Sequence, residues 1–170
     1  MKSKYTRDLT FAAVIAALYV VLSVLQNLLL PGSASMAVQF RVAEALCVLS
    51  LFSPTVVYGL GLGCLLYNLT CSGALPLDFL VGTAATLFAG WSMYALRNLR
   101  LWKLPVLSLL MPAVFNGLLV GWELTVYIGS PFWLNALCVA AGELGVLFTL
   151  GTALYLALDH GALHRRLFGR

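Results

Sequence analysis

The sequence predicts an all-α membrane protein with six transmembrane helices, and three observations support this prediction. Apolar residues make up 62% of the 170 residues, and the mean hydropathy is +0.97, which is too apolar for a soluble domain of this size. Only 9% of the residues are charged. Apolar segments recur at about the 20 residues that a helix needs to cross a bilayer. Because these segments fill nearly the whole chain, we expect one integral membrane domain, residues 1–170.

The apolar segments give the expected helices. In chain order they are Leu9–Leu30, Arg41–Phe52, Thr55–Leu69, Phe79–Leu96, Pro105–Ile128 and Phe132–Leu158. The second and third are short, so we expect a helix pair that reaches only part of the way across the membrane or borrows length from its flanks. The first run is too long for a signal peptide and lacks a convincing cleavage site, so we expect it to be retained.

The basic residues indicate the orientation, because cytoplasmic loops carry an excess of Lys and Arg. Three clusters precede the first segment, separate the fourth from the fifth, and follow the sixth. They are Lys2, Lys4 and Arg7; Arg97, Arg100 and Lys103; and Arg165, Arg166 and Arg170. An even number of helices places all three clusters and both termini in the cytoplasm. Arg41 is then the only basic residue on the outer side. The net charge of +4 is a topology signal, and we expect no nucleic-acid partner.

Acidic and amide side chains lie inside the expected segments. They are Glu44, Asn68, Asp78, Asn116, Glu123, Asn135 and Glu143. An ionised side chain at mid-membrane costs roughly 2.5–3.5 kcal/mol, so such groups pair, line a wet cavity or act in function. Glu143 is the strongest candidate, because it lies about 17 Å along its helix. Small residues on its outward side leave room above it, and nothing on its own helix neutralises it.

The fifth segment carries a polar stripe. Asn116, Glu123 and Tyr127 follow at i, i+7 and i+11, which is one face of a helix. An amide, an acid and a phenol on one face can bind a polar heterocycle. Gly117 and Gly121 lie on a neighbouring stripe and favour close helix packing as the alternative.

Three other positions have two interpretations each. Arg41 and Glu44 are three residues apart, so they either pair with each other at the helix end or reach a ligand. Asp78 either caps the fourth helix or belongs to the site. Trp133, after Phe132, belongs either to an interfacial aromatic belt or to the site.

Enzymatic, redox and metal functions find no support in the sequence. The four cysteines show no CxxC spacing and are typical of packing residues. His160 and His164 lie in a basic tail. The sequence contains neither a Gly-rich phosphate-binding loop nor a nucleophile–base pair within an apolar segment. We therefore expect a non-enzyme without cofactor or metal.

Five stretches together resemble one family. They are "VQFRVAEAL" at 38–46, "GLGLGCLLYNL" at 59–69, "DFLVGTAATL" at 78–87, "FNGLLVGWEL" at 115–124 and "PFWLNALCVAAGE" at 131–143. The chain resembles the substrate-binding S-components of energy-coupling factor (ECF) transporters, specifically the QueT family, proposed to take up queuosine precursors.

The resemblance implies a six-helix bundle in a prokaryotic plasma membrane, with a ligand site near the outer face. The loop between the first two helices would gate this site, with Gln39 and Arg41 as its lid. A transmembrane coupling subunit with two ATPase subunits would supply the energy. That subunit would dock on the small residues of the first helix, which are Ala12, Ala13, Ala16 and Ala17.

The resemblance also implies a 7-deazaguanine ligand, and the residues suit it. Glu143, Glu123, Asn116 and Arg41 supply acceptors for its N–H groups and a donor for its carbonyl, with Tyr127, Phe132 or Trp133 to stack on the ring. The expected substrate-binding residues are thus Glu143, Glu123, Asn116, Arg41, Glu44, Trp133, Tyr127, Gln39, Asn68 and Asp78. The alternatives are another basic, vitamin-like heterocycle, or a non-transporting membrane scaffold.

Overall fold

The computed structural model describes residues 2–33, 38–71, 75–101 and 104–159, and within these ranges the regular elements are helices. In chain order they are α1 (Lys2–Leu29), the 3₁₀-helix η1 (Val42–Leu51), α2 (Pro54–Thr70), α3 (Asp78–Leu96), α4 (Val106–Ile128), α5 (Phe132–Val146), the π-turn η2 (Leu147–Gly151) and α6 (Thr152–Asp159). The predicted fold class, an all-α membrane protein, is confirmed.

Four helical segments are long and apolar enough to cross a membrane. They are Lys4–Leu29, Asp78–Leu96, Val106–Ile128 and Phe132–Asp159, the last of which runs through η2 into α6. The two short segments expected from the sequence correspond to η1, with 10 residues, and α2, with 17. Both fall below the length of a full span, so the predicted count of six spans is not confirmed.

The 3₁₀-helix η1 lies at the centre of the bundle. Its residues from Ala43 to Leu51 are all buried, and it contacts every other helix of the described chain. A 3₁₀-helix rises about 2.0 Å per residue against 1.5 Å in an α-helix, so ten residues reach about 20 Å. Ser53 is the N-cap of the next helix: its hydroxyl accepts a hydrogen bond from the Thr55 N–H at 3.3 Å, and Pro54 begins α2. The 3₁₀-helix therefore spans a longer distance through the core than an α-helix of the same ten residues would.

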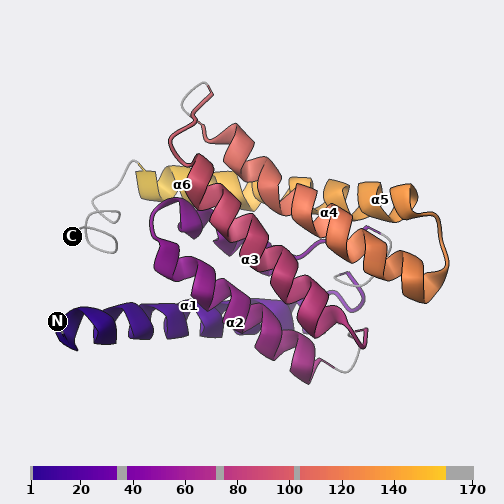
Figure 1. Ribbon diagram of the computed structural model, residues 1–170, viewed down its shortest axis with the longest axis horizontal. Helices are drawn as coiled ribbons and strands as arrows, with labels where there is room; N and C mark the ends of the chain where they lie inside the picture. The colour runs from indigo at the N-terminus through magenta and orange to yellow at the C-terminus, as the bar shows by residue number, and fades with distance from the viewer. Residues whose placement is uncertain (1, 34–37, 72–74, 102–103, 160–170) are drawn as a thin grey trace.

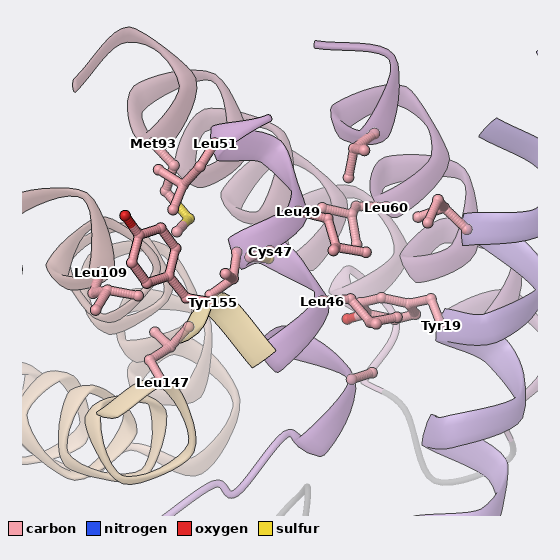
Figure 2. Packing of buried hydrophobic residues seen from close by; sticks show 14 of the residues in the cluster. Tyr19, Leu46, Cys47, Leu49, Leu51, Leu60, Met93, Leu109, Leu147 and Tyr155 are labelled. Carbon is pink, nitrogen blue, oxygen red and sulfur yellow. The ribbon is translucent and has the colours of Figure 1, made fainter. Parts of the chain in front are cut away.

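The hydrophobic core surrounds η1 on both sides (Figure 2). Cys47 lies on the side of Tyr155 from α6 and Leu147 from η2, whereas Leu46 lies on the side of Tyr19 from α1. These side chains are at most 9% exposed. Because η1 separates α1 from α6 in this way, residues at its amino-terminal end are held firmly between several helices.

Glycines allow two pairs of helices to pack closely. A Cβ atom on Gly63 of α2 would lie 2.9 Å from the carbonyl oxygen of Ala16 in α1, and one on Gly59 would lie 2.6 Å from that of Ala12. A Cβ atom on Gly121 of α4 would lie 2.8 Å from the Cα of Ala136 in α5. Such approaches exclude any larger residue, which agrees with packing as the role of Gly121.

The two ends of the bundle differ in charge. The amino terminus, the end of α6 and the connection between α3 and α4 lie at one end of the molecule (Figure 1). Arg100 and Asp159 join two of these segments through an ion pair of 3.5 Å. Lys4, Arg7 and Arg97 belong to the same end, which is thus the basic end of the described chain. Lys2 lies in α1. Lys103, Arg165, Arg166 and Arg170 lie outside the described residues, as do His160 and His164.

Candidate functional site

An ion pair between Arg41 and Asp78 forms the outermost part of a polar cluster at the opposite end. The Arg41 Nη2 lies 3.4 Å from the Asp78 Oδ1, and the Asn68 amide donates to the Asp78 carbonyl oxygen at 2.9 Å. A Cβ atom on Gly82 would lie 2.9 Å from the Asn68 amide nitrogen and 3.1 Å from the Asp78 carboxylate, so glycine leaves the room that this arrangement needs. Of the two interpretations of Asp78, the helix cap is wrong, because Leu77 occupies the cap position and the carboxylate pairs with Arg41.

The charge of Arg41 is fixed by its surroundings. Burial on its own lowers the pKa of this guanidinium, but Asp78 and, more weakly, Tyr19, Cys64 and Glu44 outweigh burial and hold the pKa above its usual range. Arg41 is therefore a permanent cation. Of the Lys and Arg residues whose side chains are described, it is the one outside the first turns of α1 and the connection from α3 to α4.

Glu44 is a fully buried carboxylate whose two oxygens are already bonded. Its Oε1 accepts from the Tyr19 hydroxyl at 2.7 Å and from the Thr86 hydroxyl at 3.2 Å, and its Oε2 accepts from the Cys47 thiol at 2.9 Å. These contacts join α1, η1 and α3. The expected ion pair between Arg41 and Glu44 is not formed, since Arg41 precedes the 3₁₀-helix and turns to Asp78 instead.

Glu143 and Asn116 form a buried pair across α5 and α4. The Asn116 Nδ2 donates to the Glu143 Oε1 at 3.2 Å, and both side chains are inaccessible. The Glu143 Oε2 and the Asn116 Oδ1 have no hydrogen-bond partner among the described residues. Buried polar atoms in native proteins are nearly always bonded, so two adjacent open acceptors indicate a place for a donor group.

Glu123 is the most isolated acid of the cluster. Its side chain is fully buried in α4, and neither carboxyl oxygen has a hydrogen-bond partner in the described part of the chain. Glu123 lies two helical turns outward from Asn116 on the same buried face.

Electrostatic interactions connect these separate contacts. The guanidinium of Arg41 acts on Glu143 and on Glu123, besides Asp78 and Glu44. Each of α3, α4, α5 and η1 contributes one of these acids, and Asp78 is the one in contact with Arg41.

The segment directly before η1 is fixed from two sides, by α1 and by α5. The backbone of Gln39 lies directly against Gly142 of α5, where a Cβ atom would collide with the Gln39 carbonyl. The Gln26 side chain of α1 accepts from the Val42 N–H at 2.8 Å and donates to the Phe40 carbonyl and to the Ser33 hydroxyl, the latter at 2.9 Å. Gln39 is itself buried, with its Oε1 unpartnered among the described residues. Residues 34–37 of the preceding loop lie outside the described residues.

The match to a known family agrees with this geometry. A model of the QueT transporter family matches residues 9–160, which is most of the chain. The chain belongs to the QueT transporter family. Comparison with curated proteins and with solved structures gave no significant match. Membership of the QueT family confirms the resemblance seen in the sequence and makes the chain a membrane transport protein.

Two aromatic residues expected in the site of this QueT family member lie apart from the carboxylates. Trp133 is 70% exposed and packs edge-on against Phe132, with ring centroids 4.9 Å apart. Tyr127 is 41% exposed, so it shares the helix but not the buried face of Asn116 and Glu123. Asn135, another predicted buried amide, bonds to Thr125 and Ser130 within the connection from α4 to α5. The exposure of Trp133 favours the interpretation that it belongs to an interfacial aromatic belt.

Three residues around the candidate site were missed by the sequence interpretation: Tyr19, Gln26 and Thr86. A signal for two of them was present. Tyr19, Ser23 and Gln26 follow at i, i+4 and i+7, and all three are buried. The same search for polar residues at helical spacing that found the stripe of the fifth segment would have found Tyr19 and Gln26 in the first segment. Thr86 lies in a mostly apolar helix that also carries Thr83 and Ser92, and the sequence interpretation drew no stripe there.

Proposed function

We propose that this QueT family member is the substrate-binding S-component of an ECF transporter, and that it captures a queuosine precursor of the 7-deazaguanine type at the outer face of a prokaryotic plasma membrane. Family membership supports the transport role. The observation that carries the ligand assignment is the buried pair of Glu143 and Asn116, which has one open acceptor on each partner.

The chemistry of a 7-deazaguanine suits these open atoms. The heterocycle presents neighbouring N–H donors at N1 and at the exocyclic amine, and an acceptor at O6. The open oxygens of Glu143 and Asn116 accept from the two donors. Arg41, the permanent cation of the cluster, donates to O6. The small residues Val139 and Ala136, outward from Glu143 on α5, belong to the same buried face.

Energy for uptake would come from partner subunits, namely a transmembrane coupling subunit and two ATPases. We expect the coupling subunit to dock on α1. We limit the proposed docking face to part of the predicted residues, because Ala12 and Ala16 pack against glycines of α2 inside the chain. Ala13 and Ala17 are exposed and remain available. Small residues four apart allow close approach of another transmembrane helix.

A second candidate is an S-component for another basic heterocycle. The surplus of carboxylates over cations at the outer end favours basic ligands in general. A scaffold without ligand would have no use for open, buried carboxylates, whose burial lowers stability unless a partner compensates for it.

Thermal unfolding in detergent, with a panel of deazapurines, purines and B vitamins, tests the proposal. A ligand at 100 times its dissociation constant stabilises the fold by about 2.7 kcal/mol, which is easily detected. We expect stabilisation by 7-deazaguanines. Stabilisation by a B vitamin alone would select the second candidate, and no response to any compound would favour the scaffold.

A further inference from the structure

A recess at the basic end of the molecule lies between the first turns of α4 and the connection that leads to it from α3. Its volume is about 530 Å³, which is within the roughly 300–1,000 Å³ of ligand pockets. Aliphatic side chains form most of its lining, namely Leu99, Leu101, Val106, Leu107 and Leu110. Asn98 and Arg100 complete the lining with polar groups. None of these residues belongs to the polar cluster at the other end.

The connection gives the recess an ordered wall with an accessible cation. Leu101 and Leu104 exchange both of their backbone hydrogen bonds, at 2.8 and 3.0 Å. The Arg100 Nη1 lies 3.5 Å from the Asp159 Oδ2, but the Arg100 side chain is still 50% exposed. A guanidinium carries five N–H donors, so this single contact leaves donors of Arg100 for another acceptor.

An aromatic group on α2 and α3 marks the level of the membrane surface. Trp91 packs edge-on against Tyr58 and Tyr94, with ring centroids 5.7 and 6.2 Å apart. The Arg97 guanidinium lies 3.9 Å from the centre of the Tyr94 ring. Trp and Tyr are enriched where the hydrocarbon meets the headgroups. The recess begins at Asn98, directly after this group, so it lies at the level of the lipid headgroups.

The apolar lining selects a hydrocarbon occupant. Leu107 lines the recess and is 43% exposed on α4, which is one of the segments long and apolar enough to cross a membrane. A recess that opens beside such a helix is in contact with lipid, and an acyl chain fills an aliphatic space without loss of hydrogen bonds.

The charges select an anionic headgroup. In the described parts of the connection and of α6, Arg97 and Arg100 outnumber the one acid, Asp159. The first turn of α4 holds no acidic residue and no side-chain cap, so the positive end of its dipole adds to the same field. Basic pockets at the ends of transmembrane helices bind anionic lipid headgroups in this way.

We propose that this recess binds an anionic glycerophospholipid, with an acyl chain against Leu107 and Leu110 and the phosphate on Arg100. The inference depends neither on the transported substrate nor on partner subunits, so it stands or falls separately from the proposed function. Because the lipid binds only the folded chain, it should also raise the temperature of thermal unfolding.

Native mass spectrometry of the purified full chain in detergent tests this site. The chain receives equal amounts of phosphatidylglycerol and phosphatidylcholine with identical acyl chains, and the ratio of the two lipid-bound forms is measured. We expect phosphatidylglycerol to be favoured roughly fivefold or more, the effect of one or two basic side chains near a membrane surface. Glycerol 3-phosphate, which has no acyl chains, should not bind at the same concentration.

Matched variants assign the preference to its residue. Arg100→Gln should lower the ratio several-fold. Asp159→Asn breaks the same ion pair but keeps the cation, so the ratio should stay or rise. Arg7→Gln removes a cation of α1 at the same end and should leave the ratio unchanged. Leu110→Trp fills the recess and should reduce bound phosphatidylglycerol although Arg100 remains. Thermal unfolding without added lipid checks that each variant is folded.

Each contrary outcome overturns a different part of the inference. Equal retention of the two lipids by the wild-type chain would overturn the anionic preference. A preference that survives in folded Arg100→Gln, or that falls equally in Arg7→Gln, would show attraction to the basic end in general and no site at the recess. Binding of glycerol 3-phosphate as tight as that of phosphatidylglycerol would show that the recess takes a phosphate and no acyl chain.

Discussion

Arg41 pairs with Asp78 although Glu44 is far nearer in the sequence. Glu44 instead accepts hydrogen bonds from Tyr19, Thr86 and Cys47. Among the described acids, the carboxyl oxygens without a hydrogen-bond partner lie on Glu123 and Glu143. A buried charge is tolerated when it is paired or hydrogen-bonded. Residues that the protein satisfies therefore hold the site together, whereas those that it leaves open are the ones expected to meet the ligand.

Glu143 and Asn116 should act as one unit. We expect Glu143→Gln to weaken binding of a 7-deazaguanine by roughly 1.5–3 kcal/mol, because the ligand loses a charge-assisted bond. Asn116→Ala should also weaken binding, and the double variant should cost less than the sum, since the two side chains bond to each other. Calorimetric titration of all four proteins measures this coupling. Unchanged affinity in Glu143→Gln would remove this residue from the site.

Tyr19 should be a structural residue, in contrast to Glu143. Tyr19→Phe leaves the Oε1 of buried Glu44 with Thr86 alone, so we expect a loss of about 1–3 kcal/mol in stability. Urea unfolding in mild detergent compares it with Tyr58→Phe, at an exposed position. Equal stability of both variants would show that the Tyr19–Glu44 bond contributes nothing.

At the scale of elements, the segment before η1 depends on α1 and α5 for its position. Gln26 holds it from α1 through both ends of its amide, and Gly142 provides the surface on α5 against which Gln39 lies. Because η1 contacts every other helix of the described chain, its start is held firmly. We expect Gln39 and Arg41, directly before it, to govern access to the acids.

Gln26→Leu keeps most of the side-chain volume and removes the hydrogen bonds that tie the segment before η1 to α1. We expect ligand dissociation to become several-fold faster, with a smaller change in association, because a lid governs escape from an occluded site. Arg41→Ala should act in the same direction, because it frees the lid from Asp78. Stopped-flow rates measure both steps.

Ser23→Ala is the control for this measurement, since Ser23 is buried on the same face of α1, one turn before Gln26. A dissociation rate in Gln26→Leu that matches the control would contradict a role of Gln26 in the lid.

At the scale of the whole molecule, the two faces of α1 have different tasks. Ala16 is buried against Gly63 of α2, whereas Ala13 and Ala17 are exposed to the surroundings of the bundle. One helix therefore holds the site through Tyr19 and Gln26 on its inner face and offers small residues on its outer face. This division predicts that ligand binding and the proposed docking of a coupling subunit can be separated by mutation.

Ala13→Trp should leave ligand affinity near the wild-type value but abolish co-purification with the coupling subunit and uptake in cells, because a bulky residue prevents close helix approach. Ala16→Trp should instead destabilise the chain itself, since its neighbour is the backbone of α2. Titration, co-purification and uptake are measured on both. Wild-type uptake by Ala13→Trp would show that this face docks no partner.

The sequence by itself determined the all-α membrane class, the apolar segments and the acids inside them, because hydropathy, charge and helical period are local properties of the chain. It placed Asn116 and Glu123 on one face, and the structure agrees. Only the tertiary structure decided the partners. Arg41 pairs with a residue 37 positions away, and Glu44 accepts from residues 25 and 42 positions away. The 3₁₀ form of η1 and the inward face of Ala16 were likewise decided by packing against other helices, which no local pattern encodes.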